Sequence, residues 1–284
     1  MNDLKLYKTS KGIFVEYQEH WYTINAVWDE LVNRKDLYNN IKSELAKLSP
    51  QQDAAALVQQ HILPPIGDQE VWAAGVTYYR SKVARMDESE IAGGASFYDK
   101  VYEAARPELF FKATPQRTVG HEQEIYIRRD STWNVPEPEL TLFINKYAQI
   151  AGYTIGNDMS SRSIEGENPL YLPQAKSYDK SAAIGPCLLI TEHPIPQDTT
   201  IAMKIQRNGE ELFNDSILIN QMKRTHTELV EYLYRECSFP NGCFLMTGTC
   251  LVPENNFTLH EKDQIEIKID HIGILRNTVK VNNS

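Results

Sequence analysis

The sequence predicts a mainly β protein of the α+β class, in which a small N-terminal α+β domain precedes a larger β domain. Short apolar runs recur from residue 109 to residue 269, and turn signals separate them. One clear amphipathic helix is expected in the same stretch, at residues 225–235. The 284 residues are enough for one large domain with a small addition.

The small domain is expected to span residues 1–66. Three short segments predict strands, at residues 4–7, 13–17 and 21–24. Apolar residues then recur at helical spacing from Val27 to Leu48, and Ser49-Pro50 ends that helical segment. Pro64-Pro65-Ile66-Gly67 is typical of a linker, which places the domain boundary near residue 66.

The larger domain, residues 67–284, is expected to be catalytic and to open with a buried strand at residues 71–78. Residues 80–105 are rich in charged residues and alanine around Gly93-Gly94, which predicts two helical pieces. Such a segment after a core strand could be an active-site lid. A solvated helical hairpin fits the pattern equally well.

Nine further segments of the larger domain predict strands, at residues 109–112, 124–129, 139–145, 150–157, 187–191, 201–206, 211–216, 244–247 and 264–269. Asn145-Lys146-Tyr147 is expected to turn one hairpin. Asn208-Gly209 is the strongest hairpin signal of the chain, because this pair favours a two-residue turn. We therefore expect a large, antiparallel β architecture.

Charge and composition exclude several classes of function. The net charge of −9 argues against nucleic-acid binding and against attachment to anionic membranes. No apolar run approaches the roughly 20 residues of a membrane span, and residues 1–5 lack the features of a signal peptide, so a cytoplasmic location is expected. The four cysteines form no C-x-x-C pair and are expected to be reduced and mostly buried.

Three carboxylates form the most informative pattern. Glu137 and Glu139 are two residues apart, so on a strand their side chains point to the same face. Asp158 follows the strand expected at residues 150–157, and a short hairpin would bring it beside the glutamates. Carboxylate oxygens are the ligands of hard divalent cations, so magnesium or manganese fits this set. Glu137 and Glu139 on their own would more often be a solvated face.

Four other residues could serve such a site. Lys176 is a candidate proton shuttle, because a nearby cation lowers the pKa of a lysine, although a lone loop lysine is usually exposed. Arg162 could hold Glu139 or a substrate carboxylate, or form a structural ion pair. Glu108 could be a general acid or base, or pair with Lys112 or Arg106. Thr249, in Thr-Gly-Thr, could help to hold an anion or belong to a plain turn.

Five motifs, in the order in which they occur along the chain, resemble the pattern of the fumarylacetoacetate hydrolase family over roughly residues 66–280. They are Glu137-x-Glu139, a Gly-Tyr-x-x-x-x-Asp-x-Ser-x-Arg segment at residues 152–162, the lysine segment, Gly185-Pro186, and Thr-Gly-Thr at residues 247–249. Residues 102–114, 136–140 and 167–174 are similar to the branch of the family that dehydrates 2-keto-3-deoxy sugar acids.

The resemblance implies a mixed β-sandwich roll, a homo-oligomer (dimer or tetramer) and a small-molecule keto acid substrate. It implies Mg²⁺, with Mn²⁺ or Ca²⁺ as substitutes, at Glu137, Glu139 and Asp158. The further site residues that it implies are catalytic Lys176 and Glu108, and the substrate contacts Ser160, Arg162 and Thr249. Either catalytic residue could be the base and the other the acid.

One departure from the family pattern bears on the reaction. Hydrolases of the family commonly carry a His-x-x-Glu dyad after the Gly-x-x-Tyr strand, and here Ser81 and Ala84 occupy those positions. Neither residue can act as a base, which favours dehydration of a 2-keto-3-deoxy-pentonate to 2,5-dioxopentanoate. Carbon–carbon hydrolysis of acylpyruvates or fumarylacetoacetate, and decarboxylation of oxaloacetate, stay open as alternatives.

Overall fold

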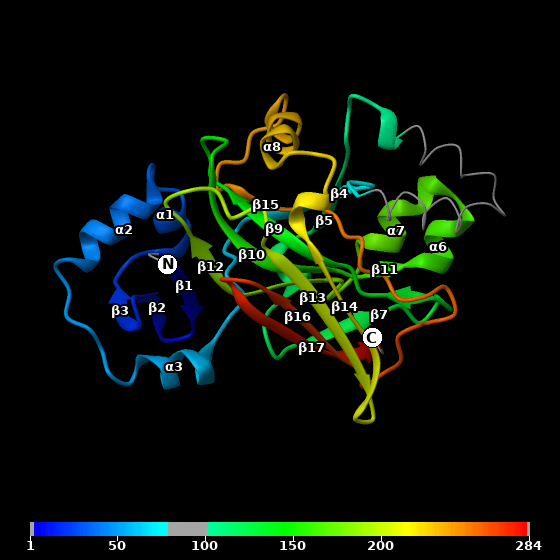
Figure 1. The fold of residues 1–284 in the computed structure, drawn as a ribbon, viewed down its shortest axis with the longest axis horizontal. Coiled ribbons are helices and arrows are strands. Elements are labelled where there is room, and N and C mark those ends of the chain that lie inside the picture. Colours follow the sequence, from blue (N-terminus) through cyan, green and yellow to red (C-terminus); the bar gives the residue numbers. More distant parts are fainter. Residues whose placement is uncertain (1–2, 79–100, 283–284) are drawn as a thin grey trace.

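The computed structural model describes residues 3–78 and 101–282, and two sheets form its frame (Figure 1). The strands of the large sheet lie in the order β3 (His20–Ile24), β2 (Gly12–Tyr17), β1 (Leu4–Thr9), β12 (Ala182–Ile190), β10 (Ile150–Asp158), β9 (Pro138–Ile144), β15 (Cys243–Met246), β4 (Glu70–Gly75) and β5 (Glu108–Ala113), with β6 (Thr118–Val119) beside β12. This arrangement confirms the predicted mainly β class.

The second sheet packs against one face of the large sheet. Its strands are β14 (Glu210–Leu218), β13 (Thr200–Arg207), β16 (Gln264–Ile269), β17 (Gly273–Val281) and β7 (Glu124–Ile127). Leu140 and Leu142 of β9 share one apolar cluster with Met203 of the second sheet. The next residue of β9, Phe143, points to the opposite face and joins a cluster with Ile41 of α2. The large sheet is therefore covered on both faces, which explains why every residue of β9 is buried.

Helices are short in the described part of the chain. They include α1 (Trp28–Val32), α2 (Leu37–Leu45), α3 (Ala54–His61), α6 (Arg162–Glu167), α7 (Leu172–Lys176) and α8 (His226–Tyr234). A further pair of two-residue strands, β8 (Asn134–Val135) and β11 (Ser160–Ser161), lies beside the helical segment that holds α6 and α7. None of the helices in the described ranges combines the length and apolar character that a transmembrane helix needs.

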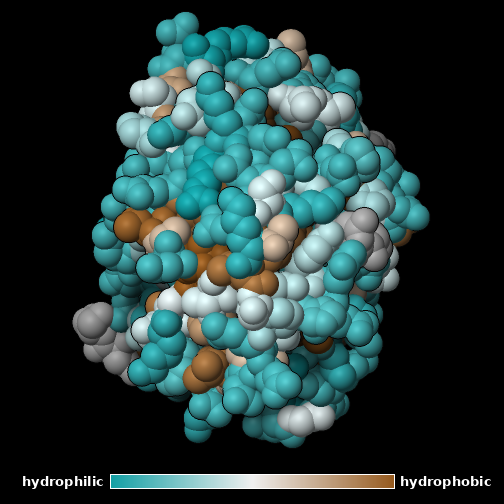
Figure 2. Space-filling model, turned by 90° about the vertical axis from the view of Figure 1, so that its left-hand side faces the viewer, coloured by the Kyte–Doolittle hydropathy of each residue, from teal (hydrophilic) through white to brown (hydrophobic). Residues whose placement is uncertain are grey.

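The predicted N-terminal domain does not stand apart from the large sheet. Its strand β1 pairs antiparallel with β12, with Leu4 opposite Ile190 and Leu6 opposite Leu188. The face of the molecule on this side is mostly hydrophilic, with a group of hydrophobic side chains near its middle (Figure 2). The division of the chain at residue 66 stays a prediction.

Several local predictions hold in the structure. Asn208 and Gly209 have φ values of 52° and 84°, and both residues of the favoured two-residue hairpin turn need a positive φ. Residues 145–149 turn the hairpin between β9 and β10, where the Asn145 backbone N–H donates to the Gln149 carbonyl. All four cysteines are free, and Cys237 is the exposed one.

Other local predictions were wrong. The helical segment at residues 27–48 is two helices, because Asp36 adopts a left-handed backbone with φ 48° between α1 and α2. The strand expected at residues 187–191 already begins at Ala182, and α3 and β17 were missed. The architecture is not wholly antiparallel, since β4–β15, β6–β12 and β7–β17 are parallel pairs. Most of the expected lid, at residues 80–105, lies outside the described residues.

Candidate active site

The three predicted carboxylates converge at one end of the large sheet. Glu137 precedes β9, Glu139 is its second residue, and Asp158 ends β10. The antiparallel register places Gly156 of β10 opposite Glu139, so the end of β10 lies beside the start of β9. One carboxylate oxygen from each residue lies within 4.8 Å of the others, and all three side chains are buried.

Cations surround this set. Lys176 Nζ lies 2.6 Å from Glu137 Oε2 and 3.0 Å from Asp158 Oδ2, and the side chain is fully buried. Arg162 Nη2 donates to Glu137 Oε1 at 2.7 Å, so the arginine pairs with Glu137 rather than with Glu139. Lys176 is not in an exposed loop, because it is the last residue of α7, which packs against β5 and β11.

Glu139 accepts a hydrogen bond from the backbone. The Gly248 N–H donates to Glu139 Oε2 at 2.6 Å, so the Thr-Gly-Thr segment binds a carboxyl group of the site itself. Burial raises the pKa of Glu139 well above its usual range, and the charges of Asp158 and Glu137 add to the rise. A bound divalent cation would reverse that effect, because it favours the ionised carboxylate.

The donor set fits a hard divalent cation such as Mg²⁺. Three buried carboxylates supply only oxygen ligands, which is the preference of magnesium, manganese and calcium. Asp158 Oδ1 accepts no aligned hydrogen bond, although it forms an ion pair with Lys112 Nζ at 2.7 Å. A buried oxygen with no aligned donor is the kind of group that a metal ion satisfies.

The other predicted residues lie around the carboxylates. Thr249 lines the same cavity as Glu139 and Lys176, and its Oγ1 accepts from the Leu251 backbone N–H at 3.2 Å. Ser160 is buried and its Oγ donates to Glu165 Oε2 at 3.0 Å.

Glu108 lies beside a β4 residue that lines the site. It pairs with Gly75 across the β4–β5 ladder, and Gly75 lines the cavity of the carboxylates. A Cβ atom at Gly75 would lie only 2.0 Å from Glu108 Oε2, so the carboxyl group packs against the backbone of Gly75 in the space that a side chain would fill. Ser81 and Ala84, the two positions of the missing dyad, lie outside the described residues.

Sequence reasoning missed Lys112 as part of this site. It entered only as a partner for Glu108, whereas its Nζ lies against Asp158 Oδ1 and donates to the Met159 carbonyl at 2.9 Å. Burial lowers the pKa of Lys112, against the opposing effect of the Asp158 charge. Strand alternation could have indicated this, since residues 108, 110 and 112 share one face of β5.

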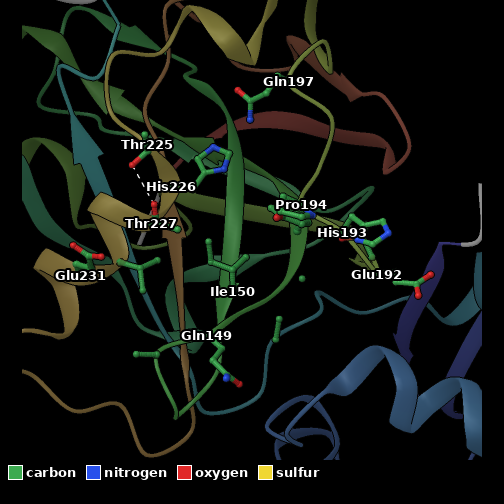
Figure 3. Close-up of a pocket in the computed structure, with 16 residues that line it drawn as sticks. Gln149, Ile150, Glu192, His193, Pro194, Gln197, Thr225, His226, Thr227 and Glu231 are labelled. Carbon is green, nitrogen blue, oxygen red and sulfur yellow. Dashed lines mark hydrogen bonds between the residues drawn. The ribbon is translucent and has the colours of Figure 1, made fainter.

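A larger cavity of about 570 Å³ lies elsewhere, between the start of β10, residues 191–197 and the start of α8 (Figure 3). Its acidic and histidine side chains are Glu192, His193, His226 and Glu231. These groups form no carboxylate cluster, so the chemistry is placed at the smaller site despite the size of this cavity.

Comparison with known proteins agrees with the geometry. Residues 71–280 match the model of the fumarylacetoacetate (FAA) hydrolase C-terminal domain. The chain belongs to the fumarylacetoacetate hydrolase family. The match covers β4 to β17 and so includes every residue of the candidate site.

Two relatives and one solved structure are similar over most of their length. A probable 2-keto-3-deoxyxylonate dehydratase of Haloferax volcanii is 48% identical over 79% of this chain and 76% of its own. The 2-dehydro-3-deoxy-D-arabinonate dehydratase of Saccharolobus solfataricus is 44% identical over 77% and 74%. A 2-keto-3-deoxy-D-arabinonate dehydratase complexed with magnesium and 2,5-dioxopentanoate superposes with a TM-score of 0.83, at 33% identity over 99% of this chain and 100% of that one.

Proposed function

We propose that the protein is a magnesium-dependent dehydratase that converts a 2-keto-3-deoxy-pentonate to 2,5-dioxopentanoate. The observation that carries the proposal is a fully buried lysine, Lys176, held against two carboxylates of an all-oxygen cage. The two similar relatives are dehydratases of such acids, and the similar solved structure holds magnesium and 2,5-dioxopentanoate.

The cation would be held by Glu137, Glu139 and Asp158. When bound there, it acts as a Lewis acid on a 2-keto acid and makes the C3 protons easier to remove. Arg162 fixes Glu137, and the Gly248 N–H fixes Glu139, so the ligand oxygens are oriented before the substrate arrives.

Lys176 and Glu108 are proposed as the two proton-transfer groups. One removes a C3 proton and the other protonates the departing C4 hydroxyl, so that water leaves and a C3–C4 double bond forms. Tautomerisation then converts the C5 alcohol end into an aldehyde. Each proton transfer contributes about 10²–10⁴-fold in typical enzymes. We propose Ser160, Arg162 and Thr249 as the residues on the substrate side of the site.

A coupled assay over a panel of 2-keto-3-deoxy acids tests the proposal. The purified protein with Mg²⁺ is expected to form a semialdehyde from a pentonate, which an added dehydrogenase oxidises with a change in nicotinamide absorbance. Acylpyruvates and oxaloacetate are run in parallel. Pyruvate release or carbon dioxide release without any semialdehyde would replace dehydration by hydrolysis or decarboxylation.

A chelator provides the control for the metal. Activity is expected to disappear in excess chelator and to return with added Mg²⁺. Full activity in excess chelator would reject the metal centre independently of the substrate.

The proposal extends to a homo-oligomer, as the family resemblance implies, and to the cytoplasmic location that the sequence predicts. The hydrophobic side chains gathered in Figure 2 offer a surface that a second copy could cover. Light scattering on the purified protein measures its mass in solution, and a monomer at micromolar concentration would contradict this part of the proposal.

A further inference from the structure

Lys112 lies on the strand that closes the site from one side. It belongs to β5, the edge strand of the large sheet next to β4. Phe110, on the same face of β5, has its ring centroid 5.8 Å from Lys176 Nζ. Because side chains alternate between the two faces of a strand, the Lys112 side chain points to the same side of β5 as Phe110, toward Lys176.

The three contacts of Lys112 Nζ reach both halves of the proposed machinery. The atom lies 2.7 Å from Asp158 Oδ1 and donates to the Met159 carbonyl at 2.9 Å. It also donates to the backbone carbonyl of Lys176. Two donors of the ammonium group thus serve backbone carbonyls, and its charge forms an ion pair with Asp158 in a fully buried environment.

The end of α7 is tied to β5 in the opposite direction as well. Ser177, directly after α7, shares its single O–H between the Phe111 carbonyl at 3.1 Å and the Lys112 carbonyl at 3.0 Å. The last carbonyls of a helix have no partner within the helix, so Lys112 supplies one that also suits the helix dipole. Strand and helix therefore hold each other at the residue that presents the Lys176 side chain.

We propose that Lys112 is a positioning residue that fixes Asp158 for the metal and Lys176 for proton transfer at the same time. The inference rests on the proposed function, because it assigns Lys112 to the same site. Lys112 touches neither substrate nor reacting atoms in this role. It acts through the orientation of one carboxylate and one helix end.

The effect of Lys112 on metal binding separates positioning from simple charge. A positive charge beside the carboxylates repels a divalent cation, so its removal would tighten Mg²⁺ binding if charge alone mattered. A residue that orients a ligand has the opposite effect, and loss of such partners typically weakens metal binding about 10–100-fold. The direction of the change therefore decides the role.

The test compares Lys112→Met with the wild type by titration calorimetry with Mg²⁺ and by steady-state kinetics. Mg²⁺ affinity is expected to fall by about 10–100-fold. At saturating Mg²⁺, kcat is expected to fall by about 100-fold, because a misplacement of about 1 Å costs that much, while KM changes little. Lys8→Met is the matched control, since Lys8 is a half-buried lysine of β1 that donates to the Ile66 carbonyl.

Unchanged or tighter Mg²⁺ binding by Lys112→Met, with kcat close to the wild type, overturns the proposal. If this variant does not fold, Lys112→Gln keeps donors for the two carbonyls without the charge, and wild-type Mg²⁺ affinity in it also overturns the proposal. A wild type that binds Mg²⁺ but dehydrates no sugar acid rejects the proposed function alone. The calorimetric comparison then still decides the role of Lys112.

Discussion

Substitution of Gly75 by alanine tests whether Glu108 takes part in the chemistry. The new Cβ would lie 2.0 Å from Glu108 Oε2 and 2.6 Å from its Cδ, whereas such contacts stay above 3.0 Å in real proteins. The Glu108 carboxyl group must therefore move by about 1 Å. It lies at the end of a flexible side chain, so the movement is expected to change the free energy of unfolding by less than about 1 kcal/mol.

The expected effect on catalysis is much larger than the effect on stability. A misplacement of about 1 Å costs roughly 100-fold in rate, which equals about 2.7 kcal/mol of activation free energy. The measurement is kcat for the 2-keto-3-deoxy-pentonate in the coupled assay, together with urea denaturation of Gly75→Ala.

The Glu108→Ala background provides the control, because no carboxyl group is left there for the Cβ to displace. Gly75→Ala is expected to have little further effect on kcat in that background. A Gly75→Ala enzyme with full kcat would refute the role of Glu108. An equal loss in both backgrounds would show that the methyl group obstructs the cavity directly.

Three further substitutions give separate predictions. In Glu139→Gln, Mg²⁺ affinity measured by calorimetry should fall by more than the roughly 10–100-fold typical of residues that only orient a metal ligand. The metal-free variant should also melt at a higher temperature than the wild type at pH 7, because a buried carboxyl group with a raised pKa has been removed. Burial lowers the pKa of His226 to about 4, so between pH 7 and pH 4 the unfolded chain binds a proton that the folded chain does not. As pH falls from 7 to 4, the free energy of unfolding of the wild type should therefore fall by up to about 3 kcal/mol relative to His226→Gln, as measured by urea denaturation. Gly209→Ala should cost about 1–2 kcal/mol in urea denaturation with unchanged kcat, because Gly209 has φ +84° and no atom within 4 Å of a new Cβ.

Each of these predictions has a contrary outcome. Wild-type Mg²⁺ affinity in Glu139→Gln would remove Glu139 from the metal site. Parallel stability curves for the wild type and His226→Gln would mean that His226 titrates normally in the folded protein. An unchanged stability of Gly209→Ala would contradict the left-handed backbone at that turn.

Short-range patterns were enough to predict the convergence of the carboxylates. The spacing of Glu137 and Glu139 and a five-residue hairpin connection place them beside Asp158, and both depend on strand geometry alone. The Asn208-Gly209 turn was predictable for the same reason, since its backbone conformation is a property of the two residues.

The partners of the carboxylates were not predictable in this way. Lys112 lies 46 residues before Asp158, and the strand order β5-β4-β15-β9-β10 brings the two residues into one sheet. Lys176 has the polar surroundings of an exposed loop in sequence, and it is buried because a short helix packs onto β5. Contacts between distant strands decide these positions, and local propensity carries no information about them.

The place of β15 in the large sheet determines when the site can form during synthesis. β15 lies between β4 and β9, parallel to the first and antiparallel to the second, so it joins the half that carries Gly75 and Glu108 to the half that carries Glu139 and Asp158. It is translated long after both of them. A chain that ends before Cys243 therefore lacks the strand that joins the two halves within the sheet, and we expect it to have no residual activity.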